Sequence, residues 1–140
     1  MPIQLGPPSL PWRGTRGMDK FGSGTFGASR DGGKRRHLGR DYIALPGDTG
    51  VSPLDGKVTH VGKAYANSDL GSIRIAGAGI EVRVLYIKPE VEVGQPVRVG
   101  EVIGTVQDLS AKYPGITPHV HVEVWTPIDP EVVIKMESPQ

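Results

Sequence analysis

Polar and apolar residues alternate along residues 118–125, and strict alternation of this kind predicts a β-strand. Successive side chains of a strand point to opposite faces, so His119, His121 and Glu123 are expected on one face and the intervening valines on the other, buried face. A strand fixes the spacing and direction of both imidazoles, as a metal ion or a reacting group requires. This segment is therefore the first candidate for a functional site.

Short apolar stretches separated by Gly and Pro recur along the rest of the chain and predict further short strands. The expected strands cover residues 41–45, 51–53, 56–61, 72–76 and 81–87, with very short ones within 91–104. Asp55-Gly56 and residues 77–79 are typical of hairpin turns. The predicted fold class is all-β: a folded antiparallel β-sheet or sandwich of short strands, with long Gly/Pro-rich loops and almost no helix.

Three segments are expected along the chain. Residues 1–20 form a Pro/Gly-rich N-terminal arm, residues 21–126 a single β domain, and residues 127–140 a C-terminal tail. A domain of this size buries a core without disulfides. Leu10 and Trp12 could anchor the arm on the body of the protein or on a partner, and the alternative is a poorly ordered arm.

Composition narrows the chemistry. The chain has no cysteine, which excludes thiolate metal sites, disulfides and cysteine catalysis and leaves histidine and carboxylate as the strong metal ligands. The net charge of +1 gives no general attraction to nucleic acid or to an anionic membrane. No apolar run approaches the roughly 20 residues of a transmembrane helix. We therefore expect no nucleic-acid partner and no membrane insertion.

A second histidine and a carboxylate stand four residues apart upstream, at His37 and Asp41. With His121 they supply two nitrogens and one carboxylate, the three-ligand set of a catalytic zinc ion (Zn2+) whose fourth position holds water. Zinc lowers the pKa of such a water to about 7, so that hydroxide is available at neutral pH. His119, on the same strand face as His121, is then placed to take the water's proton and deliver it to a leaving amine.

A tetrahedral intermediate needs a further group to stabilise its oxyanion. Tyr86 and Lys88 are the candidates, because strand alternation puts both side chains on one face. His60 stands alone on its predicted strand, and we interpret it as an ordinary surface residue or one with its hydrogen bonds satisfied.

The segments that carry these residues resemble the lysostaphin-type zinc metalloendopeptidases, peptidoglycan endopeptidases with the duplicated hybrid motif fold. Residues 37–47 and 53–58 match the first half of the family's pattern, and residues 93–104 and 118–124 match the second half. The resemblance covers about residues 20 to 126, and its paired motifs are rather specific.

The resemblance implies a role for each candidate. His37, Asp41 and His121 would hold zinc, and His119 would be the general base. The family cuts peptide bonds of bacterial peptidoglycan, in the stem peptides or their cross-bridges. Peptidoglycan peptides are therefore the expected substrates.

The chain departs from the family at one catalytic position. Family enzymes have a further histidine in a Tyr-x-His segment, where this chain has Lys88 after Tyr86. Residues 86–89, 112–116 and 119–123 are even more similar to the leukocyte cell-derived chemotaxin 2 branch, animal proteins considered to bind rather than to cut. The sequence thus predicts a zinc metallopeptidase, with a catalytically silent zinc-binding recognition or structural module as the alternative.

The N-terminus has neither the basic start nor the apolar core of a secretory signal peptide. A protein that acts at the cell wall or in the periplasm must then be delivered by something else. We expect it to be a cell-wall-degrading part of a virion or injection machine, such as a phage tail or baseplate-like assembly contacted through the N-terminal arm.

Overall fold

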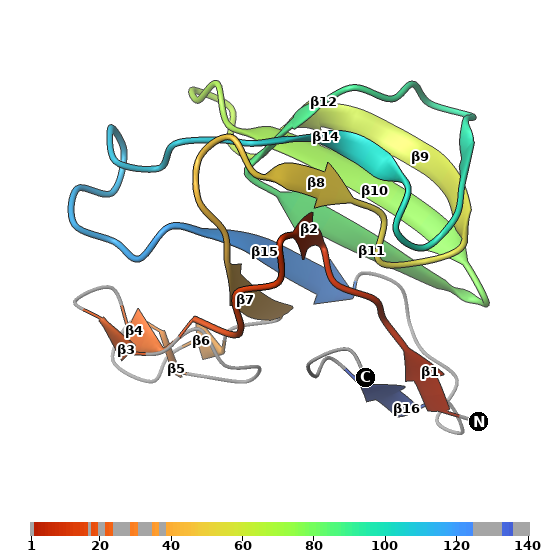
Figure 1. The fold of residues 1–140 in the computed structure, drawn as a ribbon, viewed down its shortest axis with the longest axis horizontal. Coiled ribbons are helices and arrows are strands. Elements are labelled where there is room, and N and C mark those ends of the chain that lie inside the picture. The colour runs from red at the N-terminus through yellow and green to blue at the C-terminus, as the bar shows by residue number, and fades with distance from the viewer. Residues whose placement is uncertain are drawn as a thin grey trace.

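The computed structural model describes residues 2–16, 18–19, 22–23, 29–30, 35–36, 39–124 and 133–135. These residues form strands, turns and loops without a helix, which confirms the all-β prediction (Figure 1). In the part of the chain described, there is accordingly no helix long and apolar enough to cross a membrane.

Two antiparallel sheets make up the body of the protein. The larger has six strands in the order β13-β9-β10-β11-β15-β7, and the smaller has four in the order β12-β14-β8-β2. The larger sheet consists of β13 (Pro96–Val97), β9 (Gly56–Lys63), β10 (Gly71–Gly77), β11 (Ile80–Leu85), β15 (His119–Val124) and β7 (Gly39–Ile43). The smaller sheet consists of β12 (Ile87–Pro89), β14 (Val102–Val106), β8 (Thr49–Val51) and β2 (Ser9–Leu10).

The other described strands form two-stranded pairs. The first pair is parallel and joins β1 (Pro2–Gln4) to β16 (Val133–Lys135). Two antiparallel pairs join β3 (Met18–Asp19) to β4 (Gly22–Ser23) and β5 (Ser29–Arg30) to β6 (Arg35–Arg36). The start of the expected arm therefore pairs with the expected C-terminal tail (Figure 1).

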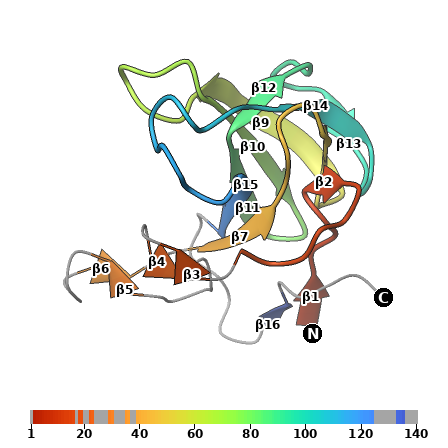
Figure 2. The same ribbon diagram turned by 60° about the vertical axis from the view of Figure 1, so that its left-hand side comes forward.

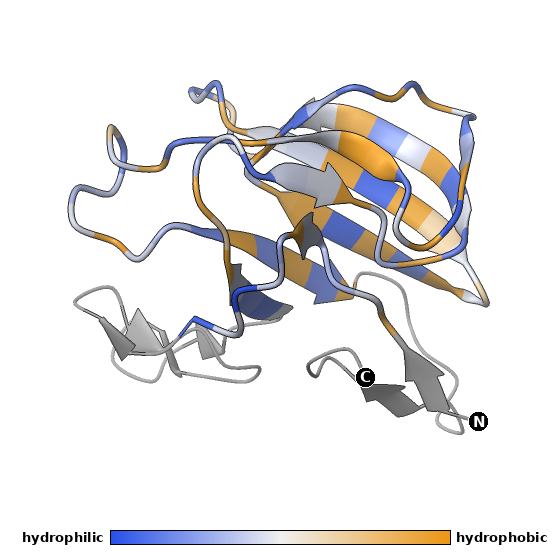
Figure 3. Ribbon diagram, viewed as in Figure 1, coloured by the Kyte–Doolittle hydropathy of each residue, from blue (hydrophilic) through white to orange (hydrophobic). Residues whose placement is uncertain are grey.

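The core lies between the two sheets, which overlie one another in both ribbon views (Figure 1, Figure 2). Ile73 and Ile75 of β10, Val82 and Val84 of β11 and Ile87 of β12 are fully buried in one apolar cluster. Apolar and polar residues alternate along β10 and β11, as the hydropathy colouring shows (Figure 3). Burial of one such aliphatic side chain contributes about 1.5–3 kcal/mol, so the alternation fixes which face of each strand is inside.

One predicted hairpin forms and the other does not. β10 and β11 pair antiparallel on either side of Ala78 and Gly79. Both residues have positive φ, 50° and 82°, as the tight turn that matches twisted strands requires. The hairpin at Asp55-Gly56 is wrong, because β8 lies in the four-stranded sheet and β9 in the six-stranded sheet. The chain crosses from one sheet to the other at this point.

Residues 5–16 of the expected arm pack on the body of the protein. Leu5 is buried in the main apolar cluster, and the Trp12 ring lies 5.3 Å from the Tyr42 ring, measured between centroids. Leu10, by contrast, is 42% exposed. Of the two expected anchors, Trp12 therefore holds the arm on the body and Leu10 does not.

Candidate active site

Asp41 and His121 lie directly opposite each other on β7 and β15. Opposed residues of an antiparallel pair have neighbouring side chains, and here Oδ1 of Asp41 lies 2.6 Å from Nδ1 of His121. His119 stands two residues earlier on β15, with its Nε2 3.6 Å from Oδ2 of Asp41. Two segments 80 residues apart in the sequence thus place one carboxylate beside two imidazoles.

Gly39 allows β7 to approach β15 this closely. It lies opposite Glu123, and a Cβ at this position would be 2.0 Å from the carbonyl oxygen of Val122. A larger residue would push the two strands apart. The glycine two residues before Asp41 therefore supports the site through the spacing of the strands.

The ring of His119 has a defined orientation and tautomer. Its Nδ1–H donates a hydrogen bond to the carbonyl oxygen of Thr117 at 2.8 Å. Because a carbonyl only accepts, Nδ1 carries the proton and Nε2 carries the lone pair of the neutral ring. Burial lowers the pKa of His119 below its ordinary value, although the charge of Asp41 opposes this shift. His119 is thus neutral near pH 7 and can accept a proton at the atom that faces Asp41.

The ring of His121 is held between two carboxylates. Its Nδ1 faces Asp41, and its Nε2 lies 3.2 Å from Oε1 of Glu123. Burial alone would lower the pKa of His121, but the hydrogen bonds to Asp41 and Glu123 and the charges of both carboxylates raise it above its ordinary value. Histidines that bind metals usually donate their other ring N–H to a group such as a carboxylate, so Glu123 leaves Nδ1 available as the ligating nitrogen.

Tyr86 lies against His119 at an irregular point of the backbone. It stands between β11 and β12 with a φ of 77°, which is uncommon for a residue other than glycine. Its buried ring meets the His119 ring edge-on, with centroids 5.4 Å apart. Its hydroxyl shares a hydrogen bond with the hydroxyl of Tyr65, which accepts another from the hydroxyl of Tyr113 at 3.3 Å.

The hydroxyls of Tyr86 and Tyr113 keep their protons at neutral pH. Burial raises the pKa of Tyr86 well above its ordinary value, and the neighbouring hydroxyls add to the shift. Burial also raises the pKa of Tyr113 to about 12. The sequence indicated Tyr86 but gave no sign of Tyr65 or Tyr113, because both come from loops far apart along the chain.

Lys88 does not share a regular strand face with Tyr86, and that expectation is wrong. The positive φ of Tyr86 breaks the alternation, and the chain passes here from β11 in the larger sheet to β12 in the smaller one. Lys88 is exposed on β12, opposite Thr105. Its role in oxyanion stabilisation stays a prediction.

Arg16 is a site residue that the sequence did not indicate. Its Nη1 donates to Oδ2 of Asp41 at 2.6 Å, and both side chains are almost fully buried. The two residues are 25 positions apart, and Arg16 belongs to the segment expected to be an arm. No local pattern relates them, so the contact follows from the three-dimensional structure alone.

Two of the expected ligands are of the types that zinc accepts, a carboxylate oxygen of Asp41 and an imidazole nitrogen of His121, and these atoms lie 2.6 Å apart. Among the residues that the structure describes, no three His, Asp or Glu side chains are arranged to hold a metal ion. The third expected ligand, His37, lies outside the described residues. The two expected ligands that the structure describes are thus adjacent and fit zinc in the type of their ligating atoms.

The comparison with protein families covers the same strands. The model described as Peptidase family M23 matches residues 35–131, more than half of the chain and including both β7 and β15. The chain belongs to peptidase family M23. This is the lysostaphin-type family that its motifs resemble. Arg16 lies before residues 35–131 and so outside the region that matches the family.

Relatives of this M23 chain include a chemotaxin. Leukocyte cell-derived chemotaxin-2 of Mus musculus is 36% identical over 117 residues, which cover 82% of this chain and 76% of the relative. A solved structure of a zinc containing peptidase from Vibrio cholerae is 26% identical with a TM-score of 0.55, over 91% of this chain and 41% of that chain. Lysostaphin shares the fold, with a TM-score of 0.58 at 18% identity over 86% of this chain and 50% of that one.

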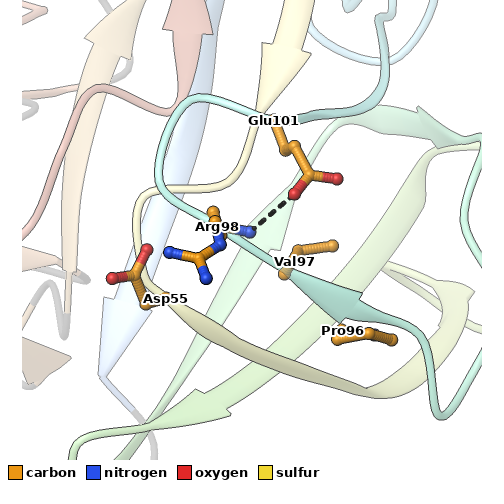
Figure 4. Close-up of a pocket in the computed structure, with 5 residues that line it drawn as sticks. All are labelled: Asp55, Pro96, Val97, Arg98 and Glu101. Atoms are coloured by element: carbon orange, nitrogen blue, oxygen red, sulfur yellow. Dashed lines mark hydrogen bonds between the residues drawn. The ribbon is translucent and has the colours of Figure 1, made fainter.

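A pocket of about 570 Å³ lies elsewhere on the M23 domain (Figure 4). It is lined by Asp55, Pro96, Val97, Arg98 and Glu101. These residues surround β13, at the edge of the six-stranded sheet opposite β7. The pocket is therefore separate from the histidine site.

Proposed function

We propose that this chain is a zinc-dependent endopeptidase that hydrolyses peptide bonds of bacterial peptidoglycan. Membership of peptidase family M23 supports the reaction class. The observation that carries the proposal is the meeting of Asp41 and His121 beside His119, whose Nε2 is the basic atom of its ring. A purely structural metal site would have no use for that additional base.

His37, Asp41 and His121 would hold the zinc ion. Two imidazoles and one carboxylate leave a coordination position open, as catalytic zinc sites require. When bound, zinc supplies a water molecule of lowered pKa and polarises the substrate carbonyl. Glu123 supports this arrangement by orienting the ring of His121.

His119 would act first as general base and then as general acid. Its hydrogen bond to Thr117 fixes the ring, and its lowered pKa keeps Nε2 unprotonated at neutral pH. Nε2 can then accept a proton from the attacking water molecule and donate it to the leaving amine. The protonated hydroxyl of Tyr86 and the amine of Lys88 are the candidate donors to the oxyanion.

A catalytically silent zinc-binding module is the second candidate function. The identity of 36% to chemotaxin-2 favours it, as does Lys88 in place of the family histidine. The same three residues would bind zinc, and a wall peptide or a protein partner would be bound without being cut. Delivery of the chain by a virion or injection machine stays a prediction under either candidate.

Digestion of purified peptidoglycan separates the two candidates. The zinc-loaded chain should release new amino groups from walls of a suitable cross-link type. His119→Ala should abolish this release while metal analysis still finds zinc bound. His60→Ala, which changes an exposed histidine on β9, is the matched control and should retain both properties.

Two results would contradict the proposal. Absence of release from walls of every cross-link type, despite full zinc occupancy, would favour the binding module. Unchanged zinc content in both His37→Ala and Asp41→Ala would refute the assigned ligands. Metal analysis and digestion must therefore be done on the same preparations.

A further inference from the structure

Residues 14–16 extend the six-stranded sheet beyond β7. The N–H of Ile43 donates to the carbonyl oxygen of Gly14 at 2.8 Å, and the N–H of Arg16 donates to that of Asp41 at 2.9 Å. Thr15 forms an antiparallel bridge with Tyr42 between these bonds. Figure 2 shows the chain running from β2 past β7. The backbone of Arg16 is therefore fixed against the backbone of Asp41.

Side chains hold the same segment on the body of the protein. The Trp12 ring packs on the Tyr42 ring. Arg13 donates from Nε and Nη2 to the two carboxylate oxygens of Asp48, at 2.7 and 3.0 Å. The chain is thus anchored immediately before Arg16, and the position of its guanidinium does not depend on the contact with Asp41 alone.

The two carboxylate oxygens of Asp41 face different groups. Oδ1 lies 2.6 Å from Nδ1 of His121, and Oδ2 accepts from Nη1 of Arg16 at 2.6 Å. Hydrogen bonds between an arginine and a carboxylate are charge-assisted and strong, and burial reduces the screening of this pair by salt. A rotation of the carboxylate would break both contacts. Arg16 therefore helps to determine which oxygen faces His121.

We propose that Arg16 is a positioning residue for the metal site, which holds Oδ2 of Asp41 so that Oδ1 is presented beside Nδ1 of His121. This inference rests on the proposed zinc-binding function. Arg16 lies outside residues 35–131, so the N-terminal segment completes a site whose ligands belong to the matched part of the chain. The segment is thus part of the metal site as well as an arm.

A buried arginine beside a metal ligand could instead oppose metal binding through charge repulsion. The geometry argues against this role, because Arg16 engages the oxygen of Asp41 that does not face His121. Its backbone is also fixed to Asp41, so the guanidinium need not leave when a metal ion binds. The two roles predict opposite changes in metal affinity when Arg16 is replaced.

Metal affinities of Arg16 variants of the full chain test the inference. Dissociation constants for Zn2+ and Co2+ are measured by competition with a chelator, and the visible spectrum of the Co2+ form reports on the ligand geometry. Arg16→Met keeps the length of the side chain but removes its donors, and should weaken Zn2+ binding about 10–100-fold and change the Co2+ spectrum. Arg16→Lys keeps the charge without the planar donors and should be intermediate.

Arg98→Met is the matched control. It removes an exposed arginine beside β13, at the edge of the six-stranded sheet opposite β7, and should leave the affinity for Zn2+ and the Co2+ spectrum unchanged. Unchanged or tighter Zn2+ binding by Arg16→Met would overturn the inference, and tighter binding would identify Arg16 as a competitor of the metal.

The folding of each metal-free variant is checked by circular dichroism. If Arg16→Met does not fold, Arg16→Lys decides: weaker Zn2+ binding supports the inference, and equal or tighter binding overturns it. A wild-type chain that binds neither metal would overturn the proposed zinc function and the role of Arg16 with it. A wild-type chain that binds Zn2+ no better than its Arg16 variants would overturn the role of Arg16 alone.

Discussion

Oε1 of Glu123 lies 3.2 Å from Nε2 of His121, two residues earlier on the same strand. Arg83 stands opposite Glu123 on β11, and its Nη1 lies 3.6 Å from the same oxygen. Arg83 is itself held, because Nε donates to Oγ of Ser72 at 3.0 Å and Nη2 donates to the carbonyl oxygen of Ala64 at 3.1 Å. A chain of polar contacts thus connects the neighbouring strands to the imidazole of His121 and orients it.

Removal of the Glu123 carboxylate should weaken metal binding. Glu123→Ala is expected to lower the affinity for Zn2+ about 10–100-fold, because the ring of His121 loses the acceptor that fixes its orientation. Glu123→Gln keeps an acceptor without the charge and should have a smaller effect. Competition with a chelator measures both. Glu81→Ala is the control, since Glu81 bonds to Thr59 rather than to the site, and equal affinity in Glu123→Ala and wild type would contradict this role.

The two histidines of the site should affect the stability of the metal-free protein in opposite pH ranges. The raised pKa of His121 stabilises the fold fully below its ordinary value of 6.5, and this contribution is lost as the pH rises through the folded-state pKa. The lowered pKa of His119 stabilises the fold above 6.5, and that contribution is lost as the pH falls through its folded-state pKa.

Variants that remove one histidine should reveal the contribution of the other. Metal-free His119→Ala retains His121 and should lose stability as the pH rises above 6.5, whereas His121→Ala retains His119 and should lose stability as the pH falls below 6.5. Denaturant unfolding between pH 5 and 8 with chelator present measures both slopes. Titration of the imidazole protons by NMR gives a direct check, and a His119 ring that titrates above His121 would contradict the assignment.

The parts of the site that depend on local periodicity could be predicted from the sequence. His119 and His121 share a face because a strand has a period of two wherever it pairs. The turn at residues 77–79 could be predicted from its glycines, and Gly79 indeed has the positive φ that glycine tolerates. Both features are encoded within a few residues and need no knowledge of the partner strand.

The remaining features depend on contacts between distant segments. Arg16 reaches Asp41 only because residues 14–16 pair with β7, a register that no local pattern indicates. The prediction that Tyr86 and Lys88 share a strand face failed because the chain passes from one sheet to the other at Tyr86, which has a positive φ. The prediction of a hairpin at Asp55-Gly56 failed for a similar reason. The chain crosses between the two sheets there, and the turn residues at such a crossing resemble those of a hairpin.

The hydroxyl of Tyr86 should contribute to turnover rather than to metal binding. Tyr86→Phe is expected to lower kcat on peptidoglycan peptides by about 10²-fold, the loss typical of one oxyanion donor, while Zn2+ affinity stays unchanged. Steady-state kinetics on a soluble wall peptide separate kcat from KM. Tyr42→Phe is the control, because Tyr42 is also buried but alternates with Asp41 on β7 and so faces away from it. An unchanged kcat in Tyr86→Phe would remove Tyr86 from the mechanism.

Restoring the family histidine at position 88 should raise turnover. Lys88→His recreates the Tyr-x-His segment, and a histidine there can donate to the oxyanion or transfer a proton, so kcat should rise about tenfold or more. Lys88 is exposed on β12, so the change in the free energy of unfolding should stay within about 0.5 kcal/mol. Kinetics, chelator competition and denaturant unfolding measure kcat, the affinity for Zn2+ and the free energy of unfolding on the same preparations.

Lys57→His is the matched control for position 88. Lys57 is also exposed, but it lies on β9 and pairs with β13. These strands are at the edge of the six-stranded sheet opposite β7, away from the histidine site. Lys57→His should change neither kcat nor the affinity for Zn2+. An increase in kcat seen only in Lys88→His is then due to the position of the new histidine and not to the addition of a histidine as such. Equal or lower turnover in Lys88→His, with Zn2+ still bound, would contradict the prediction. The lysine would then already act as the donor to the oxyanion, or a step that does not involve position 88 would limit turnover.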